Sequence, residues 1–586
     1  MARSDRSFRS GSRFSFFRLL GWVLAGALLG AALLPVRWAY WARLDDVAPF
    51  RERVAPARDA FYRLEGPVRR LFGGYAVPDT LPVLRLTLGP NENRLWMARL
   101  DTIRARGVNV GAGKEWVRAD ISIGTEAREG PPATAAEVTW HGKFRRHWGG
   151  RQRSFKVKLG GGSKWWGLSS FALLTPDNRD GPGLLLAAQL ARAAGVWHPR
   201  VRVVRVEIND DDCGMYYAEE LIDEEFLARR GLKGGAVLTP RATWADDFAD
   251  HRRDVPYGQG VGFNRAAHVN ALALEPAFQE VETASDSVAA TALAQWARLR
   301  DLVTADSASA DSSTVAAAFD VAAWGAADAL RHLLADRHNL ANDNLHVAYD
   351  PRTGRFQPIY RFEGGLARAE RQRGLTNGPT LSYNGAPLPL WRFVNSNPTL
   401  RLAKLRALHR LTATTAPVEE ALQAAAPATE LLTHAPGSQL PVRWRTWQAT
   451  ELAAVLRHNR ALIHQSLTQD LWLYGTATLR GGYLLLDLLP EGEGAVKLGE
   501  AYVMAASDDG STRLPLSATL VADVAHVGGS PETVELAPRR VQVRVPWNGG
   551  RATVGSTPIR ARNFLTGELL DPKRVRVQVV RVRVVR

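Results

Sequence analysis

The chain has 586 residues, too many for one hydrophobic core, and at roughly 150 residues per domain it predicts three or four parts. Its hydrophobic fraction of 46% and charged fraction of 23% are those of a globular protein. The net charge of +16 arises from 75 Lys+Arg against 59 Asp+Glu, and no nucleic-acid motif accompanies it, so we expect no specific nucleic-acid partner. The single cysteine, Cys213, excludes an intrachain disulfide and supplies no zinc-ligand set.

The amino terminus predicts a transmembrane anchor. Residues 19–36, LLGWVLAGALLGAALLPV, carry no charge, and a helix of this length rises about 27 Å, enough to cross a hydrocarbon core. Trp38, Tyr40 and Trp41 follow at the position of an aromatic belt. The alternative is a cleaved signal peptide, for which ALLGA offers small residues, but the apolar run is longer than a typical signal-peptide core.

An uncleaved anchor also predicts an orientation. Arginines precede it at Arg3, Arg6, Arg9, Arg13 and Arg18. The positive-inside rule therefore predicts a single-pass protein of the bacterial inner (cytoplasmic) membrane, with a basic cytoplasmic tail at residues 1–18 and the bulk of the chain on the extracytoplasmic side. Gly26 and Gly30 form a small-xxx-small pair through which the anchor could dimerise.

Helical and strand patterns follow in turn. Residues 37–82 predict an amphipathic helical stalk. Strands are expected from residue 83, because VLRLTL, VRADISIG, AEVTWHGKF and SFKVKLGG alternate apolar and polar residues between turn residues. Residues 182–194 predict a helix with Pro182 near its start and Gly195 just past its end.

The middle of the chain mixes a hairpin, an irregular connection and helices. VRVVRVEI and MYYAEELI predict a strand pair around an NDDDCG turn, at residues 201–208 and 215–222. Residues 240–285 are irregular, which is typical of either a functional lid or a mobile insert. Helices are predicted at 287–304, 319–335, 398–412, 417–426 and 446–467.

The last part of the chain predicts a separate all-β sandwich over residues 471–586. LWLYGTATL, GYLLLDLL, PLSATLVADVA and RRVQVRV alternate as strands, and RVRVQVVRVRVV ends the chain. The final strand places arginines in a row on one face. This is either a solvated sheet face or a surface that binds an acidic polymer or lipid.

One stretch, residues 336–365, carries residue types suited to phosphoryl transfer. Asp336 and Asn344 precede a strand, LHVAY, and a DPRTG turn leads into FQPIY and Glu363. In kinase-like folds one Asp faces the substrate hydroxyl, an Asn binds metal and a later acid holds Mg²⁺. The alternative is an exposed β-hairpin without chemistry.

A second cluster lies upstream, in WHGKFRRHWGGRQRSFKVKL at residues 140–159. Lys156 and Lys158 are two apart in a strand, so they share a face. A lysine beneath a glycine-bearing turn can hold α/β phosphates, and Glu220 is an acid that could pair with it. Glu219 points to the opposite face, so one of the two glutamates faces the cleft. The alternative is a surface strand with solvated lysines.

In this order, the motifs resemble the spore-coat protein H (CotH) kinase-like family over about residues 83–412. The longest block of resemblance runs from FALLTPDNRDGPGLLLAAQLARAAGVWHPR to VEINDDDCGMYYAEELIDEEFL. GKFRRHWGGRQRSFKVKL and DRHNLANDNLHVAYDPRTGRFQPI are similar to two further segments of the family.

The resemblance implies a role for each candidate site residue. Lys156 or Lys158 would bind phosphates and Glu220 would be the family's glutamate. Asp336 would be the catalytic acid, and Asn344 and Glu363 would bind metal. The family's Trp-Asp-x-Asp-like metal motif is replaced here by Tyr360-Arg361-Phe362-Glu363-Gly364. Arg361, if it points inward, would place a positive charge where the metal belongs.

The sequence therefore predicts an α+β fold: a kinase-like module with an N-terminal transmembrane helix and a C-terminal all-β sandwich domain. The expected parts are a tail (1–18), an anchor (19–36), a stalk (37–82), a CotH kinase-like domain (83–412), a helical connector (413–470) and the sandwich (471–586). One hypothesis is a protein kinase that uses ATP and Mg²⁺ or Mn²⁺ to phosphorylate Ser/Thr of an envelope protein. The alternative is a degenerate pseudokinase that serves as an envelope scaffold. The membrane, through residues 19–36, is an expected partner in both cases.

Overall fold

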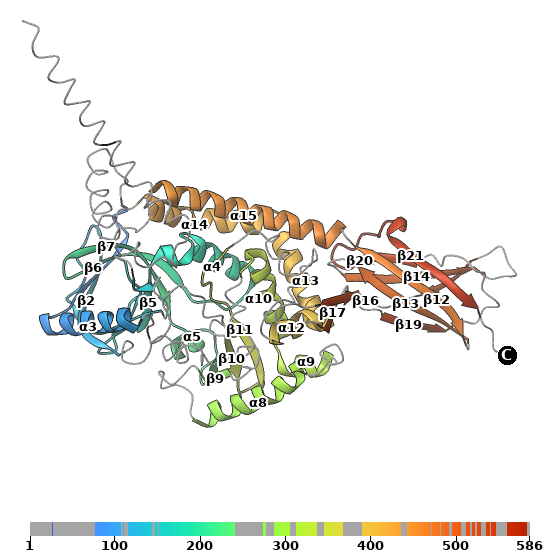
Figure 1. The fold of residues 1–586 in the computed structure, drawn as a ribbon, viewed down its shortest axis with the longest axis horizontal. Coiled ribbons are helices and arrows are strands. Elements are labelled where there is room, and N and C mark those ends of the chain that lie inside the picture. The colour runs from blue at the N-terminus through green and yellow to red at the C-terminus, as the bar shows by residue number, and fades with distance from the viewer. Residues whose placement is uncertain are drawn as a thin grey trace, which may run out of the picture. The chain divides into compact units, whose positions relative to one another are not determined.

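A computed structural model provides the structure of the chain. It describes residues 26, 77–106, 109, 115–142, 147–149, 152–240, 274–276, 286–304, 312–336, 345–366, 389–434, 442–469, 471–480, 482–491, 495–504, 511–515, 519–521, 524–528, 535–538, 541–546 and 559–582. The backbone divides into two compact units, Met1–Gly74 with Asp250–Phe263, and Tyr75–Ala249 with Asn264–Arg586. All described residues except Gly26 belong to the second unit, whose elements are shown in Figure 1.

Seven strands of the described chain close into a barrel in the order β1-β2-β3-β4-β5-β7-β6. The strands are β1 (Pro82–Thr87), β2 (Val117–Thr125), β3 (Thr134–Trp140), β4 (Phe155–Leu159), β5 (Ser170–Leu174), β6 (Val201–Ile208) and β7 (Asp211–Glu220). Neighbouring strands are antiparallel except at the closure, where β6 runs parallel to β1 and Val206 lies opposite Leu84.

Alternation along the strands decides which side chains fill the barrel. On β4, Phe155 and Val157 are buried in its core, whereas Lys156 and Lys158 point to the other face. Helix α3 (Pro90–Arg106) also contributes to this core through Trp96. The sequence patterns did not predict this helix, because its apolar residues are few among charged ones.

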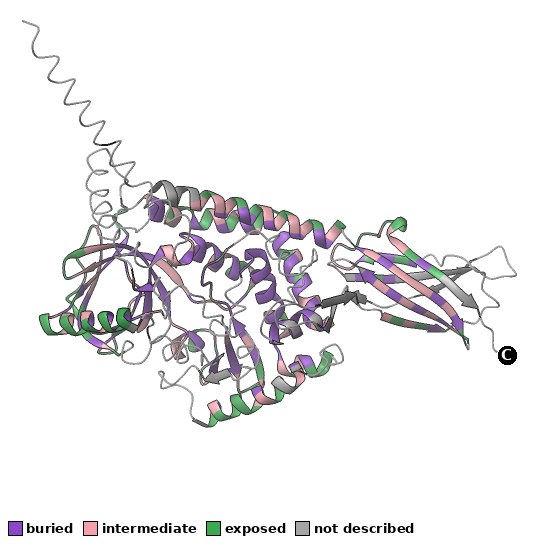
Figure 2. Ribbon diagram, viewed as in Figure 1, coloured by how far each residue is buried: buried purple, intermediate pink, exposed green. Residues whose placement is uncertain are grey.

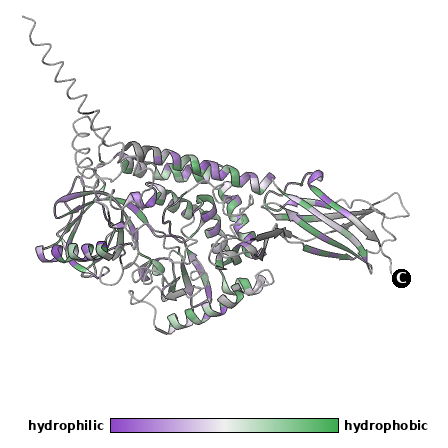
Figure 3. Cartoon of the chain, in the orientation of Figure 1, coloured by the Kyte–Doolittle hydropathy of each residue, from purple (hydrophilic) through white to green (hydrophobic). Residues whose placement is uncertain are grey.

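A layer of helices covers the outer face of β5 and β7. It consists of α4 (Gly183–Ala194), α10 (Val321–Leu334), α13 (Pro398–Thr412), α14 (Ala416–His434) and α15 (Val442–Gln469), whose apolar side chains form one cluster. Figure 2 shows α4 and α10 as mostly buried, and Figure 3 shows hydrophilic and hydrophobic residues mixed along α14 and α15. The predicted limits of α4 are confirmed, since Gly195 caps it with φ +71°. Helix α14 runs through Pro427, beyond its predicted end at 426.

A second sheet, with strands in the order β11-β10-β8-β9, packs against three further helices. Its strands are β8 (Ala236–Pro240), β9 (Leu274–Pro276), β10 (His346–Asp350) and β11 (Arg355–Ile359). Helices α8 (Asp286–Thr304), α9 (Ser312–Ala318) and α12 (Pro389–Ser396) share its apolar cluster. The predicted hairpin is thus β10 and β11, with Gly354 in its turn at φ +70°. It is part of a core rather than exposed, because Val347 and Phe356 are buried.

Two sheets of the C-terminal part share an apolar cluster of their own. One contains β12 (Trp472–Arg480), β13 (Tyr483–Glu491), β19 (Val541–Pro546) and β21 (Val575–Val582). The other contains β14 (Ala495–Met504), β15 (Ser511–Pro515), β16 (Thr519–Val521) and β20 (Ile559–Asn563). The remaining elements are a pair of short strands, β17 (Val524–Gly528) and β18 (Glu535–Pro538), the helix α5 (Glu224–Arg229), and the 3₁₀ turns η4 (Pro176–Arg179) and η8 (Pro572–Arg574).

The predicted fold class needs correction. The transmembrane helix is not supported: in the part of the chain that the structure describes, no helix is both long and apolar enough to cross a membrane. Helix α15 has the length, at 28 residues, but charged residues such as Arg457 run along it. Residues 19–36, except Gly26, lie outside the described residues, as do almost all of the predicted stalk and most of 240–285. The single-pass localisation depended on the anchor and is withdrawn with it.

The expected kinase-like module is not shown by the architecture either, which is mixed α/β and built on the closed barrel. Alternation predicted the strands, but it contains no information on the parallel β6–β1 pairing that closes them. The domain boundaries remain predictions. Helices α14 and α15 come from the segment predicted as a connector, and they pack in the same cluster as α4 and α10.

Candidate functional site

Lys156 lies in a row of residues that crosses three strands on the outer face of the barrel. It is opposite Ala172 on β5, and Ala172 is opposite Glu219 on β7. Residues directly opposite in neighbouring strands point to the same face, so Lys156 and Glu219 share this face across the small Ala172 side chain. Lys158 lies on the same face but is exposed, whereas Lys156 is half-buried. Lys156 is therefore the better placed of the two predicted phosphate-binding lysines.

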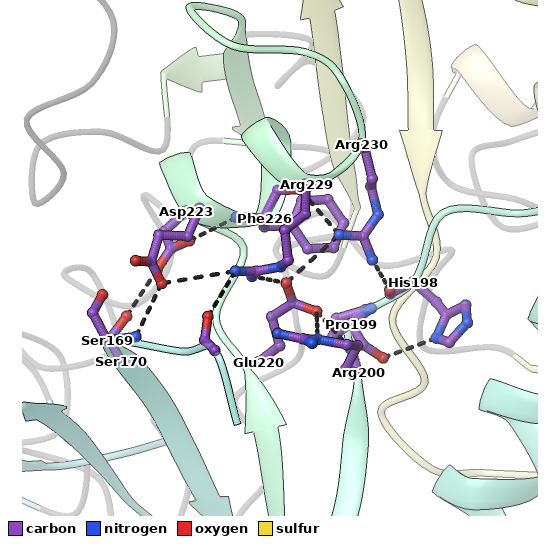
Figure 4. A network of polar contacts seen from close by, with 12 residues as sticks. Ser169, Ser170, His198, Pro199, Arg200, Glu220, Asp223, Phe226, Arg229 and Arg230 are labelled. Carbon is purple, nitrogen blue, oxygen red and sulfur yellow. Dashed lines mark hydrogen bonds and ion pairs between the residues drawn. The ribbon is translucent and has the colours of Figure 1, made fainter. Parts of the chain in front are cut away.

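The structure brings Glu219, not the predicted Glu220, to the face of Lys156. The carboxylate of Glu220 points the opposite way and contacts Arg200, Arg229 and Arg230 (Figure 4). Strand alternation indicated that one of the two glutamates would face the cleft, but it could not say which. Only the register of β7 against β5 decides between them.

Arg361 joins Glu219 to Glu363. Its Nη2 lies 2.5 Å from Oε2 of Glu219, and its Nη1 lies 2.6 Å from Oε1 of Glu363. Burial lowers the pKa of Arg361, but the carboxylates of Glu219 and Glu363 outweigh this and raise the pKa above its ordinary value. Arg361, which the resemblance places in the family's metal motif, thus points toward Glu219 and Glu363.

The second oxygen of Glu363 is also engaged. Arg179, whose side chain is 0% exposed, has Nη2 2.7 Å from Oε2 of Glu363, and its Nη1 donates to the Glu363 carbonyl at 3.2 Å. Both carboxylate oxygens of the predicted metal ligand are therefore paired with guanidinium groups. Sequence reasoning did not single out Arg179, which lies 184 residues from Glu363 in the chain.

The turn after β11 holds Glu363 against Arg179. Oδ2 of Asp180 accepts hydrogen bonds from the backbone N–H groups of Gly365, at 2.5 Å, and Leu366, at 2.9 Å. Gly364 has φ +98°, a conformation that favours glycine. The two glycines that follow Glu363 in the sequence are thus part of the connection that positions its carboxylate.

Asp336, the predicted catalytic acid, lies just beyond the end of α10. Ala335 caps the helix in the left-handed region, with φ +49°, and the Asp336 N–H donates to the carbonyl of Arg331 at 2.9 Å. The carboxylate is 0% exposed, and its Oδ2 accepts a hydrogen bond from the hydroxyl of Tyr360 at 2.7 Å. Tyr360 precedes Arg361 directly, so the buried acid and the ion-paired cluster are held by neighbouring residues.

Cationic groups surround the lysine end of the site. The pKa of His141 is well below its ordinary value, first because the ring is buried and then because Arg361, His147, Lys156 and Arg179 oppose its protonation. Because its pKa is lowered, the ring of His141, which directly follows β3, is neutral at pH 7. A field of this sign is suited to an anionic group more than to a metal ion.

The resemblance implies Mg²⁺ and ATP at this site. A magnesium ion at Glu363 would have to displace Arg361 or Arg179 from its carboxylate, so the residues as they stand do not fit the metal. In the described ranges, no cluster of three His, Cys, Asp or Glu could hold one. Asn344, the other predicted ligand, lies outside the described residues.

One small cavity beside this site is lined by residues that the structure describes. A cavity lined by Glu219, Tyr360, His198 and Phe362, among others, has a volume of about 10 Å³, room for about one water molecule. A larger hollow of about 430 Å³ lies between α4, α14 and α15, but no predicted site residue lines it.

Comparison with known families connects this geometry to the sequence motifs. Residues 138–290 match the family model described as CotH kinase protein. The matched segment contains Lys156, Arg179 and Glu219, whereas Asp336 and Glu363 come after its end. No curated protein matches the chain. The match covers residues 138–290 and supports, for this part of the chain, the resemblance of its motifs to the CotH kinase-like family.

Proposed function

We propose that this CotH kinase-like protein is a pseudokinase that serves as a structural or scaffolding protein. The observation that carries the proposal is the position of Arg361 between Glu219 and Glu363, at the place where the family's metal-binding acids are expected. The guanidinium of Arg361 takes the place of the metal ion between these two carboxylates.

The energy of these ion pairs supports the proposal. The side chains of Glu219, Glu363 and Arg179 are 1%, 7% and 0% exposed, and that of Arg361 is 15% exposed. Removing one partner of a buried pair costs about 3–5 kcal/mol, because the other charge is left without compensation. Metal binding at Glu363 would have to overcome a penalty of this order, which corresponds to a weakening of roughly two to four orders of magnitude.

Nucleotide binding is the first test. The full chain is heated with and without ATP, in the presence of Mg²⁺ or Mn²⁺, and we expect no change in Tm, because a ligand that does not bind gives no stabilisation. Lys156→Ala and Lys158→Ala form a matched pair of variants, since both lysines lie on one face of β4. A saturable rise in Tm that disappears in Lys156→Ala and persists in Lys158→Ala would contradict the proposal.

An active protein kinase is the second candidate, favoured by the placement of Lys156 and Glu219 in one row and of Asp336 beside Tyr360. Asp336 would orient or deprotonate a Ser/Thr hydroxyl and Lys156 would hold phosphates. Incubation with radiolabelled ATP and a Ser/Thr-rich protein tests it. Label transfer that Asp336→Asn and Glu363→Ala both abolish would support the kinase and exclude the pseudokinase.

A further inference from the structure

Two arginines at the start of β6 pack against the same tryptophan. The guanidinium carbons of Arg200 and Arg202 lie 4.9 Å and 5.2 Å from the ring centre of Trp166, and that of Arg202 lies 5.4 Å from Trp165. A guanidinium that stacks on an indole is held in place while its N–H edge stays available for other partners.

Neither arginine has its hydrogen-bonding capacity filled. Arg202 makes no hydrogen bond or ion pair with any residue that the structure describes, although it is half-buried. Nε of Arg200 is 3.5 Å from Oε2 of Glu220, but its Nε and Nη2 are shielded from solvent and have no hydrogen-bond partner. Buried polar groups are normally paired, so the Nε and Nη2 groups of Arg200 require an explanation.

The surrounding contact network has an excess of positive charge. Within the described residues it contains five cations, Lys164, Arg200, Arg202, Arg229 and Arg230, and three carboxylates, Glu220, Asp223 and Glu225. Figure 4 shows how Arg200, Arg229 and Arg230 converge on the one carboxylate of Glu220. The excess of two positive charges matches the charge of a phosphate monoester, which is about −1.5 to −2 at pH 7.

The loop that carries the tryptophans has an unusual backbone. Trp166 has φ +55°, in the left-handed region, and Gly167 follows at φ +73°. A bulky residue in this region is strained, and such strain is concentrated at ligand sites. The conformation places the indole of Trp166 against both guanidiniums.

This arrangement is separate from the face that carries Lys156. Arg202 lies opposite Ala218 on β7, and the side chain of Ala218 belongs to the barrel core. Lys156 and Glu219 lie on the other face of the same sheet. The inference is therefore independent of the proposed function.

We propose that Arg200 and Arg202, stacked on Trp166, form a binding site for a phosphate monoester dianion. Arg202 and the exposed part of Arg200, whose side chain is 33% exposed, donate charge-assisted hydrogen bonds to the phosphate oxygens, and the indole excludes water from one side of the ligand. Oε2 of Glu220 lies 3.5 Å from Nε of Arg200 and accepts a hydrogen bond from the Arg200 backbone N–H at 2.8 Å, so Glu220 is a positioning residue of this site.

Calorimetric titration of the full chain tests the site. Inorganic phosphate and O-phosphoserine are titrated separately, with acetate as a singly charged comparison. We expect saturable binding of phosphate that Arg202→Gln weakens about tenfold or more, with a smaller loss in Arg202→Lys, which keeps the charge but not the fork. Arg352→Gln removes an exposed arginine of the β10–β11 turn and should leave binding unchanged.

The outcomes are distinct. Tighter binding of O-phosphoserine identifies a phosphorylated side chain as the ligand, whereas equal or weaker binding identifies a free phosphate anion and overturns the monoester. The proposal is overturned if neither compound binds saturably, if acetate binds as tightly, or if Arg202→Gln binds phosphate as the unmodified chain does. Circular dichroism of each variant distinguishes lost binding from lost folding. A folded Arg202→Lys variant that binds phosphate as tightly as Arg352→Gln also overturns the proposal.

Discussion

Replacement of Asp328 by Asn is expected to destabilise the chain strongly. Asp328 is 0% exposed on α10; its Oδ1 accepts a hydrogen bond from Nε of Arg331 at 2.8 Å, and its Oδ2 lies 2.7 Å from Nζ of Lys404. Burial raises the pKa of Asp328, but the two cations outweigh this and hold the pKa below its ordinary range. The carboxylate is therefore charged at pH 7 and compensates two buried cations.

The expected loss is about 3–5 kcal/mol of unfolding free energy, because Asp328→Asn leaves buried positive charge uncompensated. Urea unfolding at pH 7, followed by tryptophan fluorescence and far-UV circular dichroism, measures it. Glu419→Gln is the control: its pair with Arg457 has the same kind of contact at 2.8 Å but is 43% and 54% exposed, so about 0.2–1 kcal/mol is expected.

Equal losses in Asp328→Asn and Glu419→Gln would refute this reasoning. The double variant Asp328→Asn/Lys404→Met adds a further check. It removes one of the stranded cations, so its loss should be smaller than the sum of the two single losses. Strict additivity would show that Asp328 does not act by compensating Lys404.

Three other predictions concern buried polar groups and one close contact. His141 and His332 have pKa values well below their ordinary value because both rings are buried, so the unfolded chain binds more protons below pH 6.5. The unfolding free energy should be constant above pH 6.5 and should fall below pH 6.5 by about 1.4 kcal/mol per pH unit for each histidine. Urea unfolding between pH 7 and pH 5 measures this, and an unfolding free energy that does not change with pH contradicts the prediction. Gly325→Ala places a methyl group on α10 at 2.6 Å from backbone atoms of α13, so Tm should fall even though alanine gains about 1 kcal/mol in helix propensity over glycine. A rise in Tm would show that α10 and α13 can move apart. Tyr360→Phe removes a hydrogen-bond donor to the buried Asp336, so urea unfolding should show a loss of about 1–3 kcal/mol in unfolding free energy. No loss would mean that the carboxylate does not depend on this bond.

Much of the secondary structure could be predicted because it depends on local chemistry. Pro182 and Gly195 bracket α4 in the sequence and in the structure. Alternation likewise predicted β4, β6 and the β10–β11 hairpin. Closure of the barrel could not be predicted, because it depends on the pairing of β6 with β1, which lies more than 100 residues earlier in the chain.

The site was predictable only in part, for the same reason. The period of a strand puts Lys156 and Lys158 on one face, but the choice between Glu219 and Glu220 depends on which residue of β5 each one faces. Arg179 is distant in sequence from Glu363, and no local pattern connects them. The inward position of Arg361 could be suspected from the sequence, because Arg361 is a basic residue in a motif where acids are expected.

Closure of the barrel also determines where the described chain could join to another copy of itself. A closed barrel presents no unpaired strand edge, and an unpaired edge is the usual template for aggregation. One of the two C-terminal sheets, β19-β13-β12-β21, is open, with β19 and β21 at its edges. Both edges carry exposed arginines, Arg544 and Arg576, whose like charges repel a second edge brought alongside. Unlike the barrel, this sheet can therefore pair edge to edge with another copy, and high salt, which screens the repulsion between its arginines, should favour that pairing.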